Sequence, residues 1–264
     1  MSAYLEDAMA FCIEQVEKGA EIGAEELHAG EESVTKLKDG TPQTPTDLKI
    51  DALLEKAVAN GRPSDETYLG EESVKEGRVW IADPWDGSWL RASGARMGVV
   101  SMALVINGKS VLGAVRNPFT RETFYAVEGG PAYLNGGVIS VNDVADLQGA
   151  TFTLPGSNVP SLHVGGLFNE LIVEGGGDML TSGSAIYDLL QTVMGVTTAS
   201  VYAYSSSWDG AAAHIIGRRA GAEISGLHGG PLWYGGDIDG LVITNGLVHS
   251  AMLAAVGRHL KPLR

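Results

Sequence analysis

The chain has 264 residues, and its 18 basic against 32 acidic side chains give a formal net charge of −14, which argues against a nucleic-acid polymer as its partner because such polymers are bound by clustered lysine and arginine. Cys12 is the only cysteine, so an intrachain disulfide and a thiolate zinc cluster are both excluded. The first residues lack the basic start of a signal peptide, and no apolar run approaches the roughly 20 residues that span a bilayer, so we predict a cytoplasmic protein that is not embedded in a membrane.

Two helices are predicted at the start of the chain. Residues 4–27 carry apolar side chains at helical spacing, which predicts a long amphipathic helix. A turn-rich stretch over residues 36–45 follows. Thr46 and Asp47 then precede a second apolar pattern, and a helix capped at these residues is expected there.

The pattern changes to strands between residues 66 and 141. The run VWIADP over residues 79–84 is apolar and ends in an acid and a proline. Asn107-Gly108 separates two further apolar runs, residues 99–106 and 110–115, and this pair is a strong signal for a β-hairpin. We therefore expect a meander of strands in this part of the chain.

Helices and strands alternate in the second half of the chain. Helices are predicted over residues 184–194, 209–220 and 247–259, and strands over residues 199–204, 224–227 and 241–245. A strand-rich first part followed by an alternating second part is typical of stacked α and β layers. We treat residues 1–264 as a single domain, with subdomains of approximately 1–150 and 151–264.

Three acidic turns stand out, each at the end of a predicted element. They are Gly70-Glu71-Glu72-Ser73, Asp83-Pro84-Trp85-Asp86-Gly87-Ser88 and Trp208-Asp209-Gly210-Ala211-Ala212. Each has a plain structural alternative. The first two are compatible with a surface turn or a helix start, and Asp209 is suited to capping the helix that follows it. The presence of all three favours a common site.

The turn after residues 79–82 has the composition of a metal and phosphate site. Asp83 and Asp86 can converge on one point together with the carbonyl of Trp85, and oxygen ligands of this kind suit Mg²⁺. Gly87 allows the backbone to approach a ligand closely. Ser88 offers a hydroxyl and an amide at a predicted helix N-terminus, which is a natural place for a phosphate.

These motifs closely resemble the inositol monophosphatase superfamily. The family carries G-E-E, then D-P-(I/L)-D-G-(T/S), then W-D-x-A-A, in the same order as this chain. Thr46-Asp47 matches its T-x-A-D segment, and Gly183-Ser184-Ala185 matches its G-S-A helix start. The resemblance implies an αβαβα sandwich of the inositol monophosphatase/fructose-1,6-bisphosphatase type and a homodimer. It also implies phosphatase activity, which lithium inhibits in many members of the family.

The resemblance also implies roles for particular residues. Two or three Mg²⁺ ions would be held by Glu71, Asp83, the carbonyl of Trp85, Asp86 and Asp209. A water activated by metal near Glu71 would attack the phosphorus, and Asp47, hydrogen-bonded to Ser88, would orient or deprotonate that water. Substrate contacts would come from Asp86, Gly87, Ser88, Gly183, Ser184, Ala185 and Asp209. The implied reaction is hydrolysis of a small sugar or inositol phosphate.

Departures from the family pattern leave the substrate open. Trp85 replaces Ile or Leu, and Ser88 replaces the commoner Thr, but the carbonyl and the hydroxyl remain. Residues 202–207 lack the acid that inositol-specific members carry before W-D, and Leu180 stands where Arg is common. The alternatives are a fructose-1,6-bisphosphatase, a histidinol-phosphatase, a catalytically silent metal-binding protein, and a 3'(2'),5'-bisphosphate nucleotidase. The nucleotidase would need an aromatic stacking face, for which the candidates are Tyr202, Tyr204, Trp233 and Tyr234.

Overall fold

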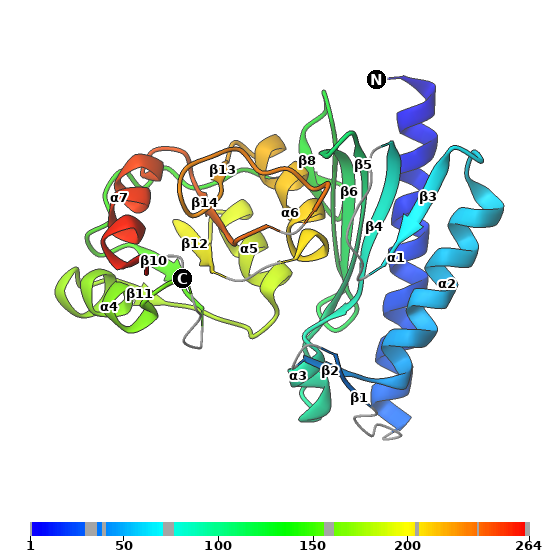
Figure 1. Ribbon diagram of the computed structural model, residues 1–264, viewed down its shortest axis with the longest axis horizontal. Helices are drawn as coiled ribbons and strands as arrows, with labels where there is room; N and C mark the ends of the chain where they lie inside the picture. Colours follow the sequence, from blue (N-terminus) through cyan, green and yellow to red (C-terminus); the bar gives the residue numbers. More distant parts are fainter. Residues whose placement is uncertain are drawn as a thin grey trace.

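Two large β-sheets alternate with three layers of helices across the molecule (Figure 1). A separate two-stranded sheet pairs β1 (Lys36–Lys38) with β2 (Thr41–Gln43), antiparallel, within the stretch predicted to be rich in turns. The computed structural model describes residues 2–29, 36–38, 41–70, 77–155, 161–203, 206–236 and 238–261. The layers run helix, sheet, helix, sheet, helix, which confirms the predicted αβαβα sandwich. Within the described ranges, no helix combines the length and apolar character needed to cross a membrane.

Helices α1 (Ala3–Ala29) and α2 (Pro45–Gly61) form one outer layer. The apolar residues of α1 recur every four positions, so they form a stripe that packs on α2 and on the larger sheet. That stripe consists of Ala8, Cys12, Val16 and Ala20, none of which is exposed. The predicted helix over residues 4–27 is confirmed and extends slightly at both ends.

Helix α2 begins earlier than predicted. Its N-cap is Thr44, not Thr46, and Pro45 occupies the first turn, where its missing N–H costs nothing. Asp47 lies three residues after the cap and closes a capping box, because its carboxylate accepts a hydrogen bond from the Thr44 amide at 2.7 Å. The prediction mistook the third position of the box for the cap itself.

The larger sheet has seven strands in sequence order. They are β3 (Glu66–Leu69), β4 (Arg78–Asp86), β5 (Val99–Ile106), β6 (Lys109–Asn117), β7 (Glu122–Val127), β8 (Ala132–Leu134) and β9 (Gly137–Val138). The hairpin predicted at Asn107-Gly108 is confirmed, since Ile106 pairs with Lys109 across it. Both turn residues have positive φ, 50° and 75°, as the tight turn favoured between antiparallel strands requires.

Helices α5 (Ala185–Val193) and α6 (Ser207–Arg219) lie between the two sheets. Small residues let α6 approach the larger sheet closely. A Cβ atom on Gly113 of β6 would lie only 2.9 Å from the Cα of Ala212 in α6, so a larger residue would push the helix away. This close packing sets the depth at which the start of α6 meets the end of β4.

The smaller sheet has the order β11-β10-β12-β14-β13, and its far face is covered by the last helix layer. Its strands are β10 (Thr151–Thr153), β11 (Asp178–Met179), β12 (Ala199–Tyr202), β13 (Glu223–Ser225) and β14 (Leu241–Thr244). The outer layer contains α4 (Val164–Phe168), the π-helix η1 (Asn169–Glu174) and α7 (His249–His259). The sequence analysis missed α4 and η1, and two glycines of α4, Gly165 and Gly166, weaken its helical pattern.

A buried ion pair joins the outer helices to the larger sheet at the end away from Asp86. The Arg62 side chain is 2% exposed and donates to the fully buried Glu66 carboxylate at 3.0 Å. Glu66 also accepts hydrogen bonds from the Tyr4 hydroxyl and the Trp80 indole, both at 2.6 Å. Burial by itself raises the pKa of Glu66, but the bonds from Arg62, Tyr4 and Trp80 outweigh it and hold that pKa below its ordinary value of 4.5.

We expect Glu66→Ala to lower the free energy of unfolding by about 3–5 kcal/mol at pH 7, because it leaves the buried Arg62 charge without its main partner. A carboxyl with a lowered pKa contributes stability that is complete above its ordinary value and is lost as pH falls through the lowered one. The wild type should therefore lose stability in acid more steeply than the variant. Urea denaturation measured from pH 3 to pH 7 tests this.

The matched control is Asp65→Ala, which removes an exposed pair between Asp65 and Arg78. Surface pairs contribute little, so this change should stay within about 1 kcal/mol. Equal losses in the two variants would contradict the role assigned to Glu66.

Candidate functional site

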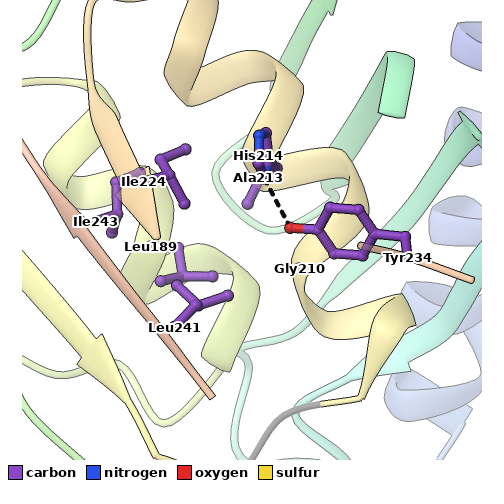
Figure 2. Close-up of a pocket in the computed structure, with 8 residues that line it drawn as sticks. All are labelled: Leu189, Gly210, Ala213, His214, Ile224, Tyr234, Leu241 and Ile243. Atoms are coloured by element: carbon purple, nitrogen blue, oxygen red, sulfur yellow. Dashed lines mark hydrogen bonds between the residues drawn. The ribbon is translucent and has the colours of Figure 1, made fainter. Parts of the chain in front are cut away.

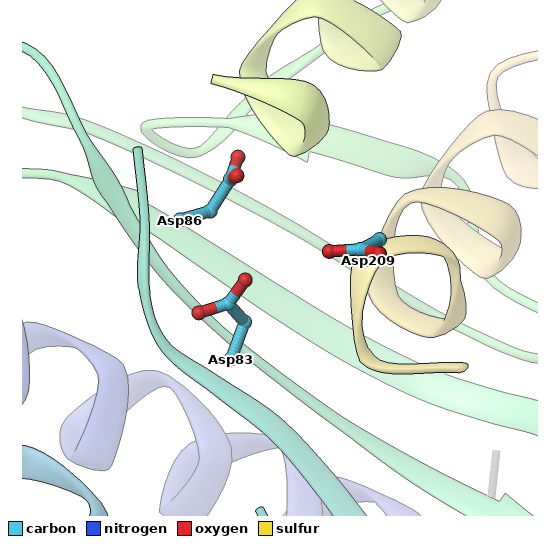
Figure 3. A group of neighbouring side chains, drawn as sticks. All are labelled: Asp83, Asp86 and Asp209. Carbon is cyan, nitrogen blue, oxygen red and sulfur yellow. The ribbon is translucent and has the colours of Figure 1, made fainter. Parts of the chain in front are cut away.

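Three carboxylates from two distant parts of the chain meet at the end of β4. One oxygen from each of Asp83, Asp86 and Asp209 lies within 4.8 Å of the others. Figure 3 shows Asp83 and Asp86 on the β4 segment and Asp209 at the first turn of α6, with their carboxylates facing a common space. The predicted convergence of the second and third acidic turns is thus present in the structure.

A bulge in β4 turns Asp83 and Asp86 to the same side. Residues three apart on a regular strand face opposite sides of the sheet. Here Asp83 pairs with Ser101 and Asp86 with Val99, so β4 holds one extra residue between the two pairs. That extra residue restores a common direction. The turn is tightened by the Trp85 amide, which donates to Asp83 Oδ1 at 2.9 Å.

The start of α5 binds the Asp86 carboxylate. The Ser184 hydroxyl and the Ile186 amide donate to Oδ2, the amide at 2.7 Å, and the Ala185 amide donates to Oδ1 at 3.2 Å. Burial raises the pKa of Asp86 to about 6 against these bonds, and the nearby Asp188 charge adds to the rise. Asp86 is therefore largely ionised at neutral pH, but it takes up a proton far more readily than an exposed aspartate.

Asp209 and Asp47 both close capping boxes at helix starts. Asp209 Oδ2 accepts from the Ser206 amide at 2.6 Å, so the capping role considered for Asp209 is real. Its carboxylate still reaches the acidic cluster, and the two roles coexist. Asp47 is buried at the start of α2. Its proposed bond to Ser88 stays a prediction, because the Ser88 hydroxyl donates to the Trp85 carbonyl at 3.1 Å.

Other predicted site residues lie at or just before helix starts. Gly87 has φ 107°, a conformation that favours glycine, and α3 (Ser88–Ala92) begins immediately after it. Ser184 is the N-cap of α5, and its hydroxyl accepts from the Tyr187 amide at 3.3 Å. Gly183 precedes it with φ 86°. Glu71 lies outside the described residues, so its assignment stays a prediction.

Two polar residues near the cluster were not predicted as part of it. The buried Asp188 carboxylate accepts from the Ser182 amide and hydroxyl, both at 2.7 Å, and so anchors the segment before α5. Tyr202 is half-buried at the end of β12, and its pKa is raised, first by burial and then by the charges of Asp86 and Asp209. Its position at a strand end, shortly before Asp209, was the available signal.

The aromatic candidates for a nucleotide stacking face differ in exposure. Tyr234 is 1% exposed and its hydroxyl contacts His214 Nδ1 at 2.9 Å, so it offers no face to a ligand (Figure 2). The space beside this pair is lined by aliphatic side chains and admits no water molecule. Burial, and secondly the Arg218 charge, lowers the pKa of His214 to about 4, so the imidazole is neutral at pH 7. Trp233 is 54% exposed, and Tyr204 lies outside the described residues.

The donor set of the cluster fits Mg²⁺. The converging atoms are carboxylate oxygens, two of the three residues are buried, and like charges this close repel one another unless a cation lies between them. Hard divalent cations prefer such oxygen ligands. Among the described residues, this is the one group of three or more acids, histidines and cysteines with metal-ligand spacing.

Comparison with known proteins agrees with these motifs. The sequence pattern of the inositol monophosphatase family matches residues 5–261. A fructose-1,6-bisphosphatase/inositol-1-monophosphatase of Thermotoga maritima is 30% identical over 194 residues, 73% of each chain. A histidinol-phosphatase of Mycobacterium tuberculosis is 30% identical over 227 residues, 81% of this chain and 84% of the relative. A solved Thermotoga maritima IMPase has a TM-score of 0.84 at 26% identity and covers 96% of this chain and 97% of its own.

We expect binding of Mg²⁺ to the metal-free protein to weaken as pH falls through about 6, because the cation competes with a proton for Asp86. Ser184→Ala removes a hydrogen bond that favours the carboxylate, so the pH midpoint should move upward. Calorimetric titrations from pH 5 to pH 8 measure the midpoint.

Ser110→Ala is the control, since the buried Ser110 hydroxyl has no hydrogen-bond partner among the described residues and lies in β6, at the hairpin end. A midpoint that moves equally in both variants, or in neither, would contradict the role of Ser184.

Proposed function

This chain belongs to the inositol monophosphatase family, and we propose that it is a Mg²⁺-dependent phosphomonoesterase that hydrolyses a small sugar or inositol phosphate. The observation that carries this proposal is the convergence of Asp83, Asp86 and Asp209 beside the start of α3. Acids that would repel a phosphate are suited to a phosphatase when a divalent cation offsets their charge.

We assign the metal ligands to Asp83, Asp86, Asp209 and the carbonyl of Trp85, with Glu71 as a further ligand outside the described residues. When bound, two or three Mg²⁺ ions would polarise the phosphoryl oxygens and lower the pKa of the attacking water. A homodimer and inhibition by lithium are further expectations that follow from the family resemblance.

The protein's own groups would hold the phosphate and direct the proton. The Gly87 and Ser88 amides lie at the start of α3, so they would donate to phosphate oxygens. Asp47, at the start of α2, would accept the proton of the attacking water directly or through Ser88. Gly183, Ser184 and Ala185 would lie against the organic part of the substrate, a position supported by the hydrogen bonds from Ser184 and Ala185 to Asp86.

Histidinol phosphate is the second substrate that the observations favour. The histidinol-phosphatase of Mycobacterium tuberculosis and the fructose-1,6-bisphosphatase/inositol-1-monophosphatase of Thermotoga maritima are both 30% identical to this chain. The histidinol-phosphatase is matched over 227 residues and the other relative over 194. Near the cluster this chain has Tyr202, a neutral hydroxyl, in the segment where inositol-specific members carry an acid. The nucleotidase reading is weakened because Tyr234 is buried.

We expect Asp83→Asn to abolish Mg²⁺-dependent phosphate release while the fold is kept, because the amide oxygen can still accept from the Trp85 amide but carries no charge for a cation. Phosphate release and far-ultraviolet circular dichroism check the two halves of this expectation. The control is Asp178→Asn, an exposed acid in β11, which should leave the rate unchanged. Full activity of Asp83→Asn would refute the metal assignment.

A substrate panel separates the candidate activities. Inositol 1-phosphate, fructose 1,6-bisphosphate, histidinol phosphate and 3'-phosphoadenosine 5'-phosphate are each assayed with Mg²⁺ and with EDTA. We expect strong release from a sugar or inositol phosphate, dependent on Mg²⁺. Preferential release from histidinol phosphate would select the second candidate, and equal release with EDTA would exclude a metal-dependent mechanism.

A further inference from the structure

We propose that Arg91 is a positioning residue that acts through Trp85 to hold the metal-binding turn in its binding conformation. This inference rests on the proposed function, because it assumes that the turn over residues 83–86 binds a divalent cation. It concerns the face of the turn that points away from the carboxylates, toward the outer helix layer. No part of it depends on contact between Arg91 and the substrate.

The indole of Trp85 occupies a slot shaped by two glycines. A Cβ atom on Gly23 of α1 would lie 2.0 Å from the indole ring, and one on Gly98 would lie 2.5 Å from it. Neither position tolerates a side chain while the indole stays in place. The ring of Phe119 closes a further side, edge-on at 6.0 Å between centroids. Trp85 is accordingly 1% exposed.

The same residue orients the metal-binding groups through its backbone. Its amide donates to Asp83 Oδ1, and its carbonyl accepts from the Ser88 hydroxyl. Asp86 follows directly in the chain. Because the side chain and the peptide groups share one Cα, the slot that holds the indole restrains the backbone of the turn, and the two hydrogen bonds then orient its amide and carbonyl.

Arg91 closes this slot from the side of α3. Its guanidinium lies over the Trp85 ring, 4.6 Å from the centroid, and the residue is 1% exposed. Nη1 donates to the Gly23 carbonyl at 2.9 Å, and Nη2 donates to the Thr46 hydroxyl at 3.0 Å. One planar group therefore stacks on the turn and bonds to both outer helices, one of them at the residue before Asp47. A cation–π contact is strongest where water is excluded, as it is here.

An arginine is needed for this combination of contacts. The guanidinium offers five N–H donors in a fixed plane and stacks on aromatic rings, whereas a lysine ammonium is a compact charge and an aliphatic residue has no donor. Burial of such a charge is costly unless its donors are satisfied. The contacts of Arg91 therefore indicate that it holds Trp85 and the two outer helices in a defined arrangement, rather than only filling space.

The test measures metal affinity and stability separately in the full-length, metal-free protein. Mn²⁺ and Mg²⁺ are titrated calorimetrically into the wild type, Arg91→Met and Arg91→Lys, and urea denaturation is followed without metal. We expect Arg91→Met to weaken metal binding about tenfold or more. Arg91→Lys keeps the positive charge but loses the planar set of N–H donors, so it should bind metal more weakly than the wild type and more tightly than Arg91→Met. If Arg91→Met does not fold, Arg91→Lys against the wild type decides the outcome.

The chain contains a matched control in Arg62. This side chain is also buried, also lies over a tryptophan ring, 5.6 Å from the centroid of Trp80, and also bonds across elements, but at the other end of β4. Arg62→Met should lower stability and leave the metal dissociation constant unchanged within about twofold. An equal loss of affinity in the two variants would reduce Arg91 to a general structural role and overturn the proposal.

A double-mutant cycle tests whether Arg91 acts through the indole. Trp85→Leu removes the stacking face, so adding Arg91→Met to it should weaken metal binding by much less than tenfold. Additive effects would show that Arg91 acts by another route and overturn the proposal. The wild-type titration separates the two levels of inference. No metal binding by the wild type refutes the proposed function, whereas normal binding by Arg91→Met and Arg91→Lys refutes the role of Arg91 alone.

Discussion

The arrangement of the site depends on the hydrogen bonds between the Asp86 carboxylate and the start of α5. The carboxylate belongs to the end of β4, yet the Ser184 hydroxyl and the Ala185 and Ile186 amides that bind it all belong to the start of α5. The first amides of a helix lack partners within the helix and favour a negative charge. One side chain thus joins the larger sheet to the middle helix layer and offsets part of the cost of its own burial.

Two further acids follow the same physical rule at helix starts. Asp209 bonds to the Ser206 amide at the start of α6, and Asp47 bonds to the Thr44 amide at the start of α2. Each carboxylate is held by backbone N–H groups, which are rigid and need no separate cation. The protein can therefore bring acids together at the cluster before any metal is bound, at the cost of the raised pKa of Asp86.

The turn over residues 83–86 is fixed from both of its sides. On the site side, α5 binds Asp86, and the bulge in β4 aligns Asp83 with it. On the other side, the indole of Trp85 fills a slot that exists because Gly23 and Gly98 have no side chains. A large aromatic residue replaces the aliphatic one typical of the family, and two glycines and a buried arginine accommodate it. The geometry of this turn depends on packing in the outer helix layer as well as on the acids.

The sequence alone determined local features such as the helical stripe of α1, the hairpin at Asn107-Gly108 and the acidic turns around Asp83 and Asp209, because each depends on neighbouring residues. It misplaced the start of α2, where the third position of the capping box was taken for the cap, and it missed α4 and η1. Only the tertiary structure decided that Asp209 meets Asp83 across 126 positions, that Ser184 binds Asp86, and that Tyr234 is buried while Trp233 is exposed. Such pairings depend on how closely helices pack on strands, as Gly113 beneath Ala212 illustrates, and that distance is set by residues far apart in the chain.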